Sequence, residues 1–359
     1  LFYLLIFFSI FFYSFSMEQV YLGESGLQVF RVIICCMSYG SKTWLPWVNE
    51  DKQAFFDILN KAYESGFRTF DTANAYSNGI NELWLGEWIK KYNINRNKIV
   101  ILSKCFFPQD PQLEGKGVTD VRTLPPHELC LQTGLSRKNI FASVQASVER
   151  LGTYIDLLQI HRMDKQTPKK EIVRALNDVV EQGLARYIGA SAMKAVEFAE
   201  LQAIADKYNY HKFISMQSFY NLLYREDERE LNYFCQNNSL GKVGLIPYSP
   251  LARGFVARPL NVSTERSSQD GAINDHYGLS ELTEADKAII NRVEEVAKRL
   301  DVPMAAVSIA WLWAKGASPI VGVNKLSQID DYLAAQKVKL TDEDVAYLDE
   351  PYAAKKSFM

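Results

Sequence analysis

Short apolar runs alternate along this chain with longer stretches in which apolar residues recur every three or four positions. The first two short runs, residues 20–22 and 28–30, flank a glycine-containing turn and predict a small β-hairpin. Residues 31–36 form a mostly apolar, β-branched run that is typical of a buried strand. Residues 51–65 place apolar side chains on one helical face and end at Gly66, which predicts an amphipathic helix.

This strand-and-helix unit recurs to the end of the chain. Further strand-like runs lie at residues 69–70, 98–102, 155–160, 187–189, 213–216, 243–246 and 319–323. Helical runs lie among them at residues 81–91, 136–151, 170–183, 195–208, 226–236, 284–300 and 303–315. Counting from residues 31–36 gives eight strands in roughly 300 residues, joined by segments long enough for parallel crossovers. We therefore predict an α/β protein, a closed (β/α)8 TIM barrel with a short N-terminal β-hairpin.

Two connections exceed ordinary loop length: residues 106–135, which contain several prolines and glycines, and residues 257–282, which are polar. Both follow predicted strands, so in a barrel both lie on the C-terminal face, where such loops are lids or disordered insertions. We expect these two loops, together with the C-terminal tail, to select the substrate. No G-x-G-x-x-G motif follows a strand, which argues against a Rossmann domain. No linker divides the chain, so residues 17–359 are predicted to form one domain.

Charge and cysteine content narrow the class of partner. The formal net charge of -2 gives no global preference for nucleic acid or for an anionic membrane. The five cysteines are an odd number without metal-site spacing, and the four histidines show no such spacing either. We expect reduced thiols in the cytoplasm, a small-molecule substrate, no metal, and a chain consistent with a monomer.

The segment 1–16 is set apart by its almost wholly apolar sequence. It is shorter than the ~20 residues that span a bilayer, and it lacks the positive region of a signal peptide. We interpret it as an over-extended gene start or a dispensable leader before Met17, and we expect no membrane association. The alternative is a membrane-directing segment, in which case Asn237 and Asn261 become glycosylation candidates.

The candidate chemistry lies at the ends of successive predicted strands. Asp71, Lys104 and His161 each follow a strand, and Tyr76 lies in the loop after Asp71. A buried lysine is costly unless paired, and Asp71 is the natural partner of Lys104. A protonated lysine beside a phenol favours the phenolate, so we expect Lys104 to depress the pKa of Tyr76. Tyr76 then suits a general acid toward a carbonyl oxygen, while His161 either orients the same oxygen by a hydrogen bond or shares in proton delivery.

Each of these residues also has an ordinary structural interpretation. Asp71 alone fits a helix N-cap, and Lys104 alone fits a rim lysine whose stem covers apolar surface. His161 alone fits a hydrogen-bonded loop histidine, and one tyrosine among 19 is usually a packing residue. All four interpretations would have to hold at once, so the joint placement favours chemistry.

With these residues in order, the chain from about residue 20 to residue 352 resembles the aldo-keto reductase superfamily. The matching segments are Asp71-Thr72-Ala73-x-x-Tyr76, residues 101–104 (ILSK), 158–161 (LQIH), 188–191 (IGAS), 217–221 (QSFYN), 247–251 (PYSPL) and 319–323 (PIVGV). Residues 36–40 (CMSYG), with Arg137 and residues 140–141, are most similar to fungal reductases of the aryl-alcohol-dehydrogenase-like group.

The resemblance implies NADPH-dependent reduction of aldehydes or ketones to alcohols, reversible as alcohol oxidation, on a substrate that includes aromatic carbonyls. It implies Tyr76 as proton donor, with Asp71, Lys104 and His161 completing a catalytic tetrad. A rival interpretation is a catalytically weak NADPH-binding regulatory or interaction subunit on the same barrel; turnover distinguishes the two.

The resemblance also implies how NADPH binds. The residues that match its cofactor site are Ser38, Asp71, Ser191, Gln217, Tyr248, Ser249, Pro250, Leu251, Arg253, Gly322, Lys325, Gln328 and Asp331. Ser191 and Gln217 match the positions that hold the nicotinamide carboxamide, and Tyr248 matches the aromatic residue that stacks on the ring. The loop after the seventh strand matches the pyrophosphate site, a usual place for phosphate in barrels. Lys325 would suit a 2′-phosphate, although it also fits a solvated residue at a helix start.

Two positions depart from the family pattern. Many relatives carry asparagine where this chain has Ala192, and glycine where it has Cys35. The first change removes an amide partner for the carboxamide, and the second adds a side chain that either crowds the barrel mouth or packs differently.

Overall fold

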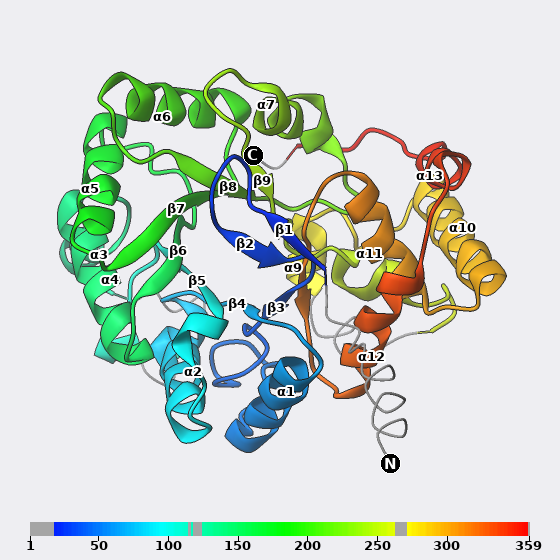
Figure 1. The fold of residues 1–359 in the computed structure, drawn as a ribbon, viewed down its shortest axis with the longest axis horizontal. Helices are drawn as coiled ribbons and strands as arrows, with labels where there is room; N and C mark the ends of the chain where they lie inside the picture. The colour runs from blue at the N-terminus through cyan, green and yellow to red at the C-terminus, as the bar shows by residue number, and fades with distance from the viewer. Residues whose placement is uncertain (1–17, 114–115, 118–123, 263–270, 358–359) are drawn as a thin grey trace, which may run out of the picture.

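A curled sheet of eight parallel strands forms the centre of the protein, with helices packed around it (Figure 1). The computed structural model describes residues 18–113, 116–117, 124–262 and 271–357. In spatial order the strands are β10 (Ile320–Gly322), β3 (Ile33–Cys35), β4 (Thr69–Asp71), β5 (Val100–Cys105), β6 (Ile155–Ile160), β7 (Ala185–Ser191), β8 (Phe213–Gln217) and β9 (Gly244–Leu245). The first and last strands also meet, because Ser318 N–H donates to the Leu245 carbonyl at 2.8 Å. The predicted (β/α)8 architecture is confirmed.

Helices cover the outside of the barrel (Figure 1). The main ones are α1 (Lys52–Glu64), α2 (Ile80–Lys91), α4 (Arg137–Leu151), α5 (Lys169–Glu181), α6 (Ala195–Lys207), α7 (Leu231–Asn237), α10 (Glu284–Leu300), α11 (Met304–Ala314), α12 (Ser327–Ala334) and α13 (Asp342–Asp349). In α5 the apolar residues Ile172, Leu176 and Val179 recur at helical spacing and are fully buried. Burying this stripe, rather than intrinsic propensity, holds such a helix on the sheet.

The predicted N-terminal hairpin is present as β1 (Gln19–Tyr21) and β2 (Gln28–Phe30), which pair antiparallel. Leu22 and Val29 pack with interior barrel residues such as Ile33 and Leu102, so the hairpin closes one end of the barrel. Its turn depends on Gly23, which has a φ of 59°; a Cβ there would lie 2.5 Å from the Lys242 carbonyl oxygen. Only glycine combines that conformation with that close approach.

Several predicted boundaries are wrong. β5 continues past residue 102 to Cys105, because Lys104 stays in register with Gln159 of β6. The helix expected over residues 226–236 is broken at Glu230 into a 3₁₀ turn, η5 (Glu226–Arg229), and α7. The two long connections contain short helices, α3 (Pro126–Gln132) and α9 (Gly271–His276).

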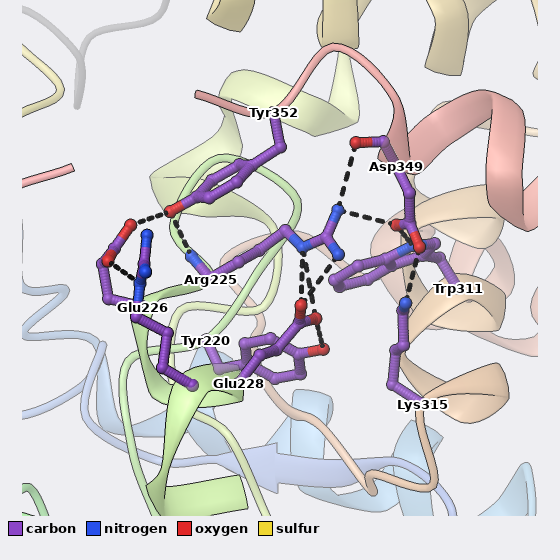
Figure 2. Close-up of polar contacts among 9 residues, drawn as sticks. Tyr220, Arg225, Glu226, Glu228, Trp311, Lys315, Asp349 and Tyr352 are labelled. Atoms are coloured by element: carbon purple, nitrogen blue, oxygen red, sulfur yellow. Dashed lines mark hydrogen bonds and ion pairs between the residues drawn. The ribbon is translucent and has the colours of Figure 1, made fainter. Parts of the chain in front are cut away.

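A polar network fastens the C-terminal segment to the loop after β8 (Figure 2). The Arg225 guanidinium lies between two carboxylates and donates to Glu228 and to Asp349, each at 2.8 Å. Tyr352 Oη donates to Glu226 at 2.7 Å and accepts from the Arg225 backbone N–H at 2.9 Å. Asp349 also accepts hydrogen bonds from Trp311 and Lys315. The network therefore joins the end of α13 to the segment that follows Gln217.

The predicted leader, residues 1–16, lies outside the described residues, so the boundary at residue 17 stays a prediction. Across residues 18–357, as far as they are described, no helix combines the length and apolar character needed to cross a bilayer.

Candidate active site

Lys104 lies at the C-terminal end of β5, with a fully buried side chain. Its ammonium group donates to Asp71 Oδ2 at 2.6 Å, to the Thr72 carbonyl at 2.8 Å and to Tyr76 Oη at 3.0 Å. An ammonium group has three hydrogens, so all of them are used. The structure thus brings together Asp71, Lys104 and Tyr76, and Asp71 supplies the charge that makes a buried lysine tolerable.

The Tyr76 hydroxyl is oriented by this arrangement. Lys104 can only donate, so the phenol oxygen accepts the 3.0 Å hydrogen bond. Within the part of the chain that the structure describes, Tyr76 Oη has no acceptor for its own hydrogen. The phenol proton is therefore left for a molecule outside the protein.

The turn that carries Tyr76 has an unusual backbone. Ser77 and Asn78 both adopt left-handed conformations, with φ of 48° and 53°. Ser77 Oγ accepts from the Ser41 N–H at 3.0 Å, and the Asn78 amide donates to the Leu113 carbonyl at 2.5 Å. Such conformations cost free energy and persist where surrounding contacts enforce them, commonly at functional sites.

The expectation that Lys104 lowers the pKa of Tyr76 is wrong for this structure. Burial raises the pKa of Tyr76 well above its ordinary value, and the nearby Asp71 and Cys35 raise it further, while Arg162 lowers it. Asp71 compensates the Lys104 charge, and burial then decides the direction. Tyr76 consequently keeps its proton at neutral pH, as a proton donor must.

His161 faces Tyr76 from the end of β6. Its backbone N–H donates to the Cys105 carbonyl at 2.9 Å. Its ring lies edge-on to the Tyr76 ring, with 6.1 Å between the ring centroids. Burial lowers the pKa of His161 well below its ordinary value, and Arg162 and Lys104 lower it further, so the imidazole is neutral at pH 7. Nδ1 is buried and has no hydrogen-bond partner among the described residues. A neutral imidazole can hold a polar ligand atom without adding charge.

Asp71 is held by two amides as well as by Lys104. Gln159 Nε2 and Gln217 Nε2 lie 3.3 and 3.1 Å from Asp71 Oδ1, and Gln217 also donates to Gln159 Oε1 at 2.9 Å. Gln159 was missed by the sequence reasoning. The signal was present as a polar residue at the end of the otherwise apolar part of β6.

Aromatic rings flank Tyr76 and His161. The centroid of the Trp44 ring lies 5.9 Å from that of the Tyr76 ring, and the centroid of the Phe107 ring lies 4.9 Å from that of the His161 ring. Trp44 and Tyr76 belong to a small apolar cluster with Val48. A flat apolar molecule could contact these rings.

The predicted cofactor-binding residues lie at strand ends on the same face. Ser191 and Gln217 are the last residues of β7 and β8, and both are buried. Tyr248 follows β9 and is half-buried. Ser38 lies beside β10, where a Cβ on Gly322 would be 3.8 Å from its Oγ.

The predicted pyrophosphate loop, Ser249, Pro250, Leu251 and Arg253, has a suitable backbone. Ser249 and Arg253 are left-handed, with φ of 50° and 58°, as is Ala252 between them. Alternating right- and left-handed residues make concave arrangements of N–H groups that bind anions. Arg253 Nε donates to Asn274 Oδ1 at 2.9 Å, which ties this loop to α9.

At the start of α12, Lys325 is exposed and forms no ion pair with any described residue. Gln328 Oε1 accepts the N–H groups of Asn324 and Lys325 at 2.7 and 3.0 Å, so its side chain fixes the segment that leads into α12. Burial and the neighbouring Asp330 raise the pKa of the half-buried Asp331.

The two departures from the family pattern have visible consequences. Ala192 has a φ of 44°, a conformation that asparagine tolerates better than alanine. Cys35 pairs with Asp71 on one side and Gly322 on the other, and it packs against the interior cluster of Ile33 and Leu102.

Asp227 is a buried carboxyl group close to this face. Burial raises the pKa of Asp227 to about 7, against a hydrogen bond with Ser218 that lowers it, and Glu226 raises it further. Its Oδ2 has no hydrogen-bond partner among the described residues. The folded protein therefore retains this proton up to about pH 7, whereas the unfolded chain loses it near pH 4.

We expect Asp227→Asn to stabilise the protein, increasingly as pH rises. In the wild-type protein, the stabilisation linked to protonated Asp227 is present in full below the pKa that Asp227 has in the unfolded chain. This stabilisation is lost as pH rises through the pKa of Asp227 in the folded protein, and the total loss is about 4 kcal/mol. The variant escapes this loss. Urea unfolding of the variant and the wild-type protein at pH 5 and pH 8 measures the difference in their free energies of unfolding. Asp57→Asn, on the exposed surface of α1, is the control. An equal effect of Asp227→Asn at both pH values would contradict the assignment.

Comparisons with known proteins agree with this geometry. The sequence profile described as the Aldo/keto reductase family matches residues 36–353. The chain belongs to this family. It is 52% identical over 335 residues to a Saccharomyces cerevisiae protein provisionally named aryl-alcohol dehydrogenase AAD16, covering 93% of this chain and 97% of that protein. It is 48% identical over 341 residues to versiconal hemiacetal acetate reductase of Aspergillus parasiticus, covering 94% and 98%.

A third similar protein is C977.14c of Schizosaccharomyces pombe, also provisionally named as an aryl-alcohol dehydrogenase. It is 50% identical over 341 residues, covering 92% of this chain and 94% of its own. These matches confirm the resemblance drawn from the motifs. The family and its carbonyl–alcohol chemistry make the protein an oxidoreductase with a small-molecule substrate.

Proposed function

We propose that this aldo/keto reductase reduces aldehydes and ketones to alcohols with NADPH, and that Tyr76 donates the proton. One observation carries the assignment of Tyr76. Lys104 uses its three hydrogens on Asp71, Thr72 and Tyr76, so the phenol oxygen is an acceptor and its own proton is available for donation to a substrate. The names of the fungal relatives support a carbonyl or alcohol substrate, and two refer to aryl alcohols.

The site residues have separate roles in this proposal. Tyr76 protonates the carbonyl oxygen, and Lys104 stabilises the resulting phenolate because its ammonium group is already in place. Asp71 is the ion-pair partner of Lys104 and is neither acid nor base. His161, neutral and with an unpartnered Nδ1, orients the carbonyl oxygen. The reverse reaction, alcohol oxidation, uses the same groups with Tyr76 as the base.

NADPH, when bound, supplies the hydride for the carbonyl carbon. The residues present fit this cofactor: Ser191 and Gln217 end adjacent strands beside Asp71, and the left-handed loop after β9 suits a pyrophosphate. Lys325, exposed and without a carboxylate partner among the described residues, suits the 2′-phosphate.

Purified protein should oxidise NADPH in the presence of benzaldehyde and form benzyl alcohol. The absorbance of NADPH follows the reaction, and 4-deuterated NADPH with product mass analysis shows direct transfer. The full chain and a chain starting at Met17 are compared to test whether the leader matters. NADPH binding without turnover on a broad panel of aldehydes and ketones would refute the proposal and favour a cofactor-binding regulatory subunit.

We expect Lys325→Ala to weaken NADPH much more than NADH. Loss of one charge-assisted contact to the 2′-phosphate should raise the KM for NADPH roughly 10-fold, by about 1.5 kcal/mol, and leave that for NADH within twofold. Lys337→Ala, at another exposed lysine, is the matched control. Equal effects on both cofactors would place Lys325 outside the 2′-phosphate site.

A further inference from the structure

Arg162 is a cation at the barrel mouth that the proposed chemistry does not use. It directly follows His161 and is half-buried. Its guanidinium donates to the His161 carbonyl at 2.7 Å, and it forms no ion pair with any residue that the structure describes. A partly buried guanidinium without an anion is costly, since it has lost water without gaining a carboxylate.

Arg162 lies in the loop that follows β6, and its charge acts on groups from other loops as well. It lowers the pKa of Tyr76, of His161 and of Tyr248, which come from three different loops on the C-terminal face. The geometry agrees, because Arg162 directly follows His161, whose ring contacts that of Tyr76, and its guanidinium folds back onto the His161 carbonyl.

The acid nearest to Arg162 in sequence is committed elsewhere. Asp164 Oδ2 accepts the Leu135 N–H and the Thr167 hydroxyl, each at 2.7 Å, and Oδ1 accepts the Gln166 N–H at 2.8 Å. These contacts fix the loop after β6 and hold the pKa of Asp164 below its ordinary value. Asp164 supports the loop that carries Arg162 without neutralising it.

The charges among the four candidate catalytic residues cancel. Asp71 and Lys104 form one buried pair, while Tyr76 and His161 are neutral at pH 7. Arg162 is then a charge without an ion-pair partner among the described residues, directly beside His161 in sequence. The rings of Trp44 and Phe107 contact those of Tyr76 and His161 and supply apolar surface at the same site. A planar fork of donors beside apolar walls matches a carboxylate attached to an apolar body.

We propose that Arg162 is a specificity-determining residue that binds a carboxylate on the carbonyl substrate. The substrate class is an aldehyde or ketone whose apolar or aromatic body also bears an acid group. This rests on the proposed reductase function and adds the charge of the substrate to it.

The test compares 3- and 4-formylbenzoate with their methyl esters, which have the same aldehyde but no charge. Two ring positions sample two distances between carboxylate and carbonyl. We expect the wild-type protein to prefer the acids at least 10-fold in kcat/KM. In Arg162→Met the acids should lose 10- to 100-fold, mainly through KM, with the esters changed less than threefold. Arg162→Lys, which keeps the charge but not the fork, should fall between.

Arg186→Met is the matched control. Arg186 lies at the N-terminal end of β7, away from the C-terminal face that carries the site, and like Arg162 it donates to one backbone carbonyl, that of Gly183. It should leave the preference intact. Equal turnover of acids and esters by the wild-type protein would overturn the proposal. So would a preference that survives Arg162→Met, or an increased dissociation constant for NADPH in that variant, which would assign Arg162 to the cofactor.

A binding measurement separates this proposal from the reductase function. Benzoate and methyl benzoate are titrated against the wild-type protein and Arg162→Met, with tryptophan fluorescence as the readout. Tighter binding of benzoate that is lost in the variant supports the carboxylate site even if no aldehyde is reduced. Reduction of the esters without any preference for benzoate or formylbenzoate would leave the reductase proposal standing and refute this one.

Discussion

Tyr76→Phe should lose reductase activity by roughly 10²- to 10⁴-fold in kcat, the range for removal of a general acid. The phenol oxygen accepts from Lys104 at 3.0 Å and has no other partner among the described residues. Phenylalanine keeps the ring that packs against Trp44 and His161 but has no proton to give. The loss should therefore fall on kcat, with the dissociation constant for NADPH unchanged within about twofold.

The control for this variant removes a hydroxyl from the same barrel but away from the site. Tyr187 lies on β7 and packs with the interior cluster at the hairpin end. Tyr187→Phe should retain near wild-type kcat. Steady-state kinetics and NADPH fluorescence titration distinguish the outcomes: full activity in Tyr76→Phe would exclude Tyr76 as the donor, and loss of NADPH binding would assign it a structural role.

Much of this site follows from sequence because the barrel fold fixes where strand ends lie. Asp71 and Lys104 are 33 positions apart, yet neighbouring parallel strands must end at the same face, and they meet at 2.6 Å. The short apolar runs also predicted every strand of the barrel, although the run that predicted β5 stopped at residue 102, before the buried Lys104. A charged residue inside a strand interrupts the apolar pattern even when a partner neutralises it.

Other features depend on distances that a pattern does not contain. The pKa of Tyr76 is raised because burial outweighs the effect of the neighbouring charges, in which Asp71 compensates Lys104. Neither the degree of burial nor the distances between these charges can be read from the sequence. Gln159 bridges toward Asp71 and Gln217 only because β6 and β8 curl toward β4 across the barrel. Likewise, the sequence places an acid, Asp164, two residues after Arg162 and so suggests an ion pair. In the structure Asp164 accepts backbone N–H groups instead, which leaves Arg162 without that partner.

Lys104→Met should lower the free energy of unfolding by about 3–5 kcal/mol, because it leaves the Asp71 carboxylate buried without a counter-ion. The double variant Asp71→Asn/Lys104→Met removes both charges and should recover most of that loss. Urea unfolding of both single variants and the double variant gives the coupling energy. Lys61→Met, which breaks the exposed pair with Asp330, should cost no more than about 1 kcal/mol.

Activity should not recover with stability in this series. Without Lys104 the Tyr76 hydroxyl is free to donate to the Thr72 carbonyl or to the residue at position 71, and its proton no longer faces the substrate. We therefore expect kcat to stay at least roughly 10²-fold below wild type in the stabilised double variant. A double variant that was as unstable as Lys104→Met would contradict the unpaired-charge argument. One that regained both stability and turnover would show that orientation of the phenol by Lys104 is not required.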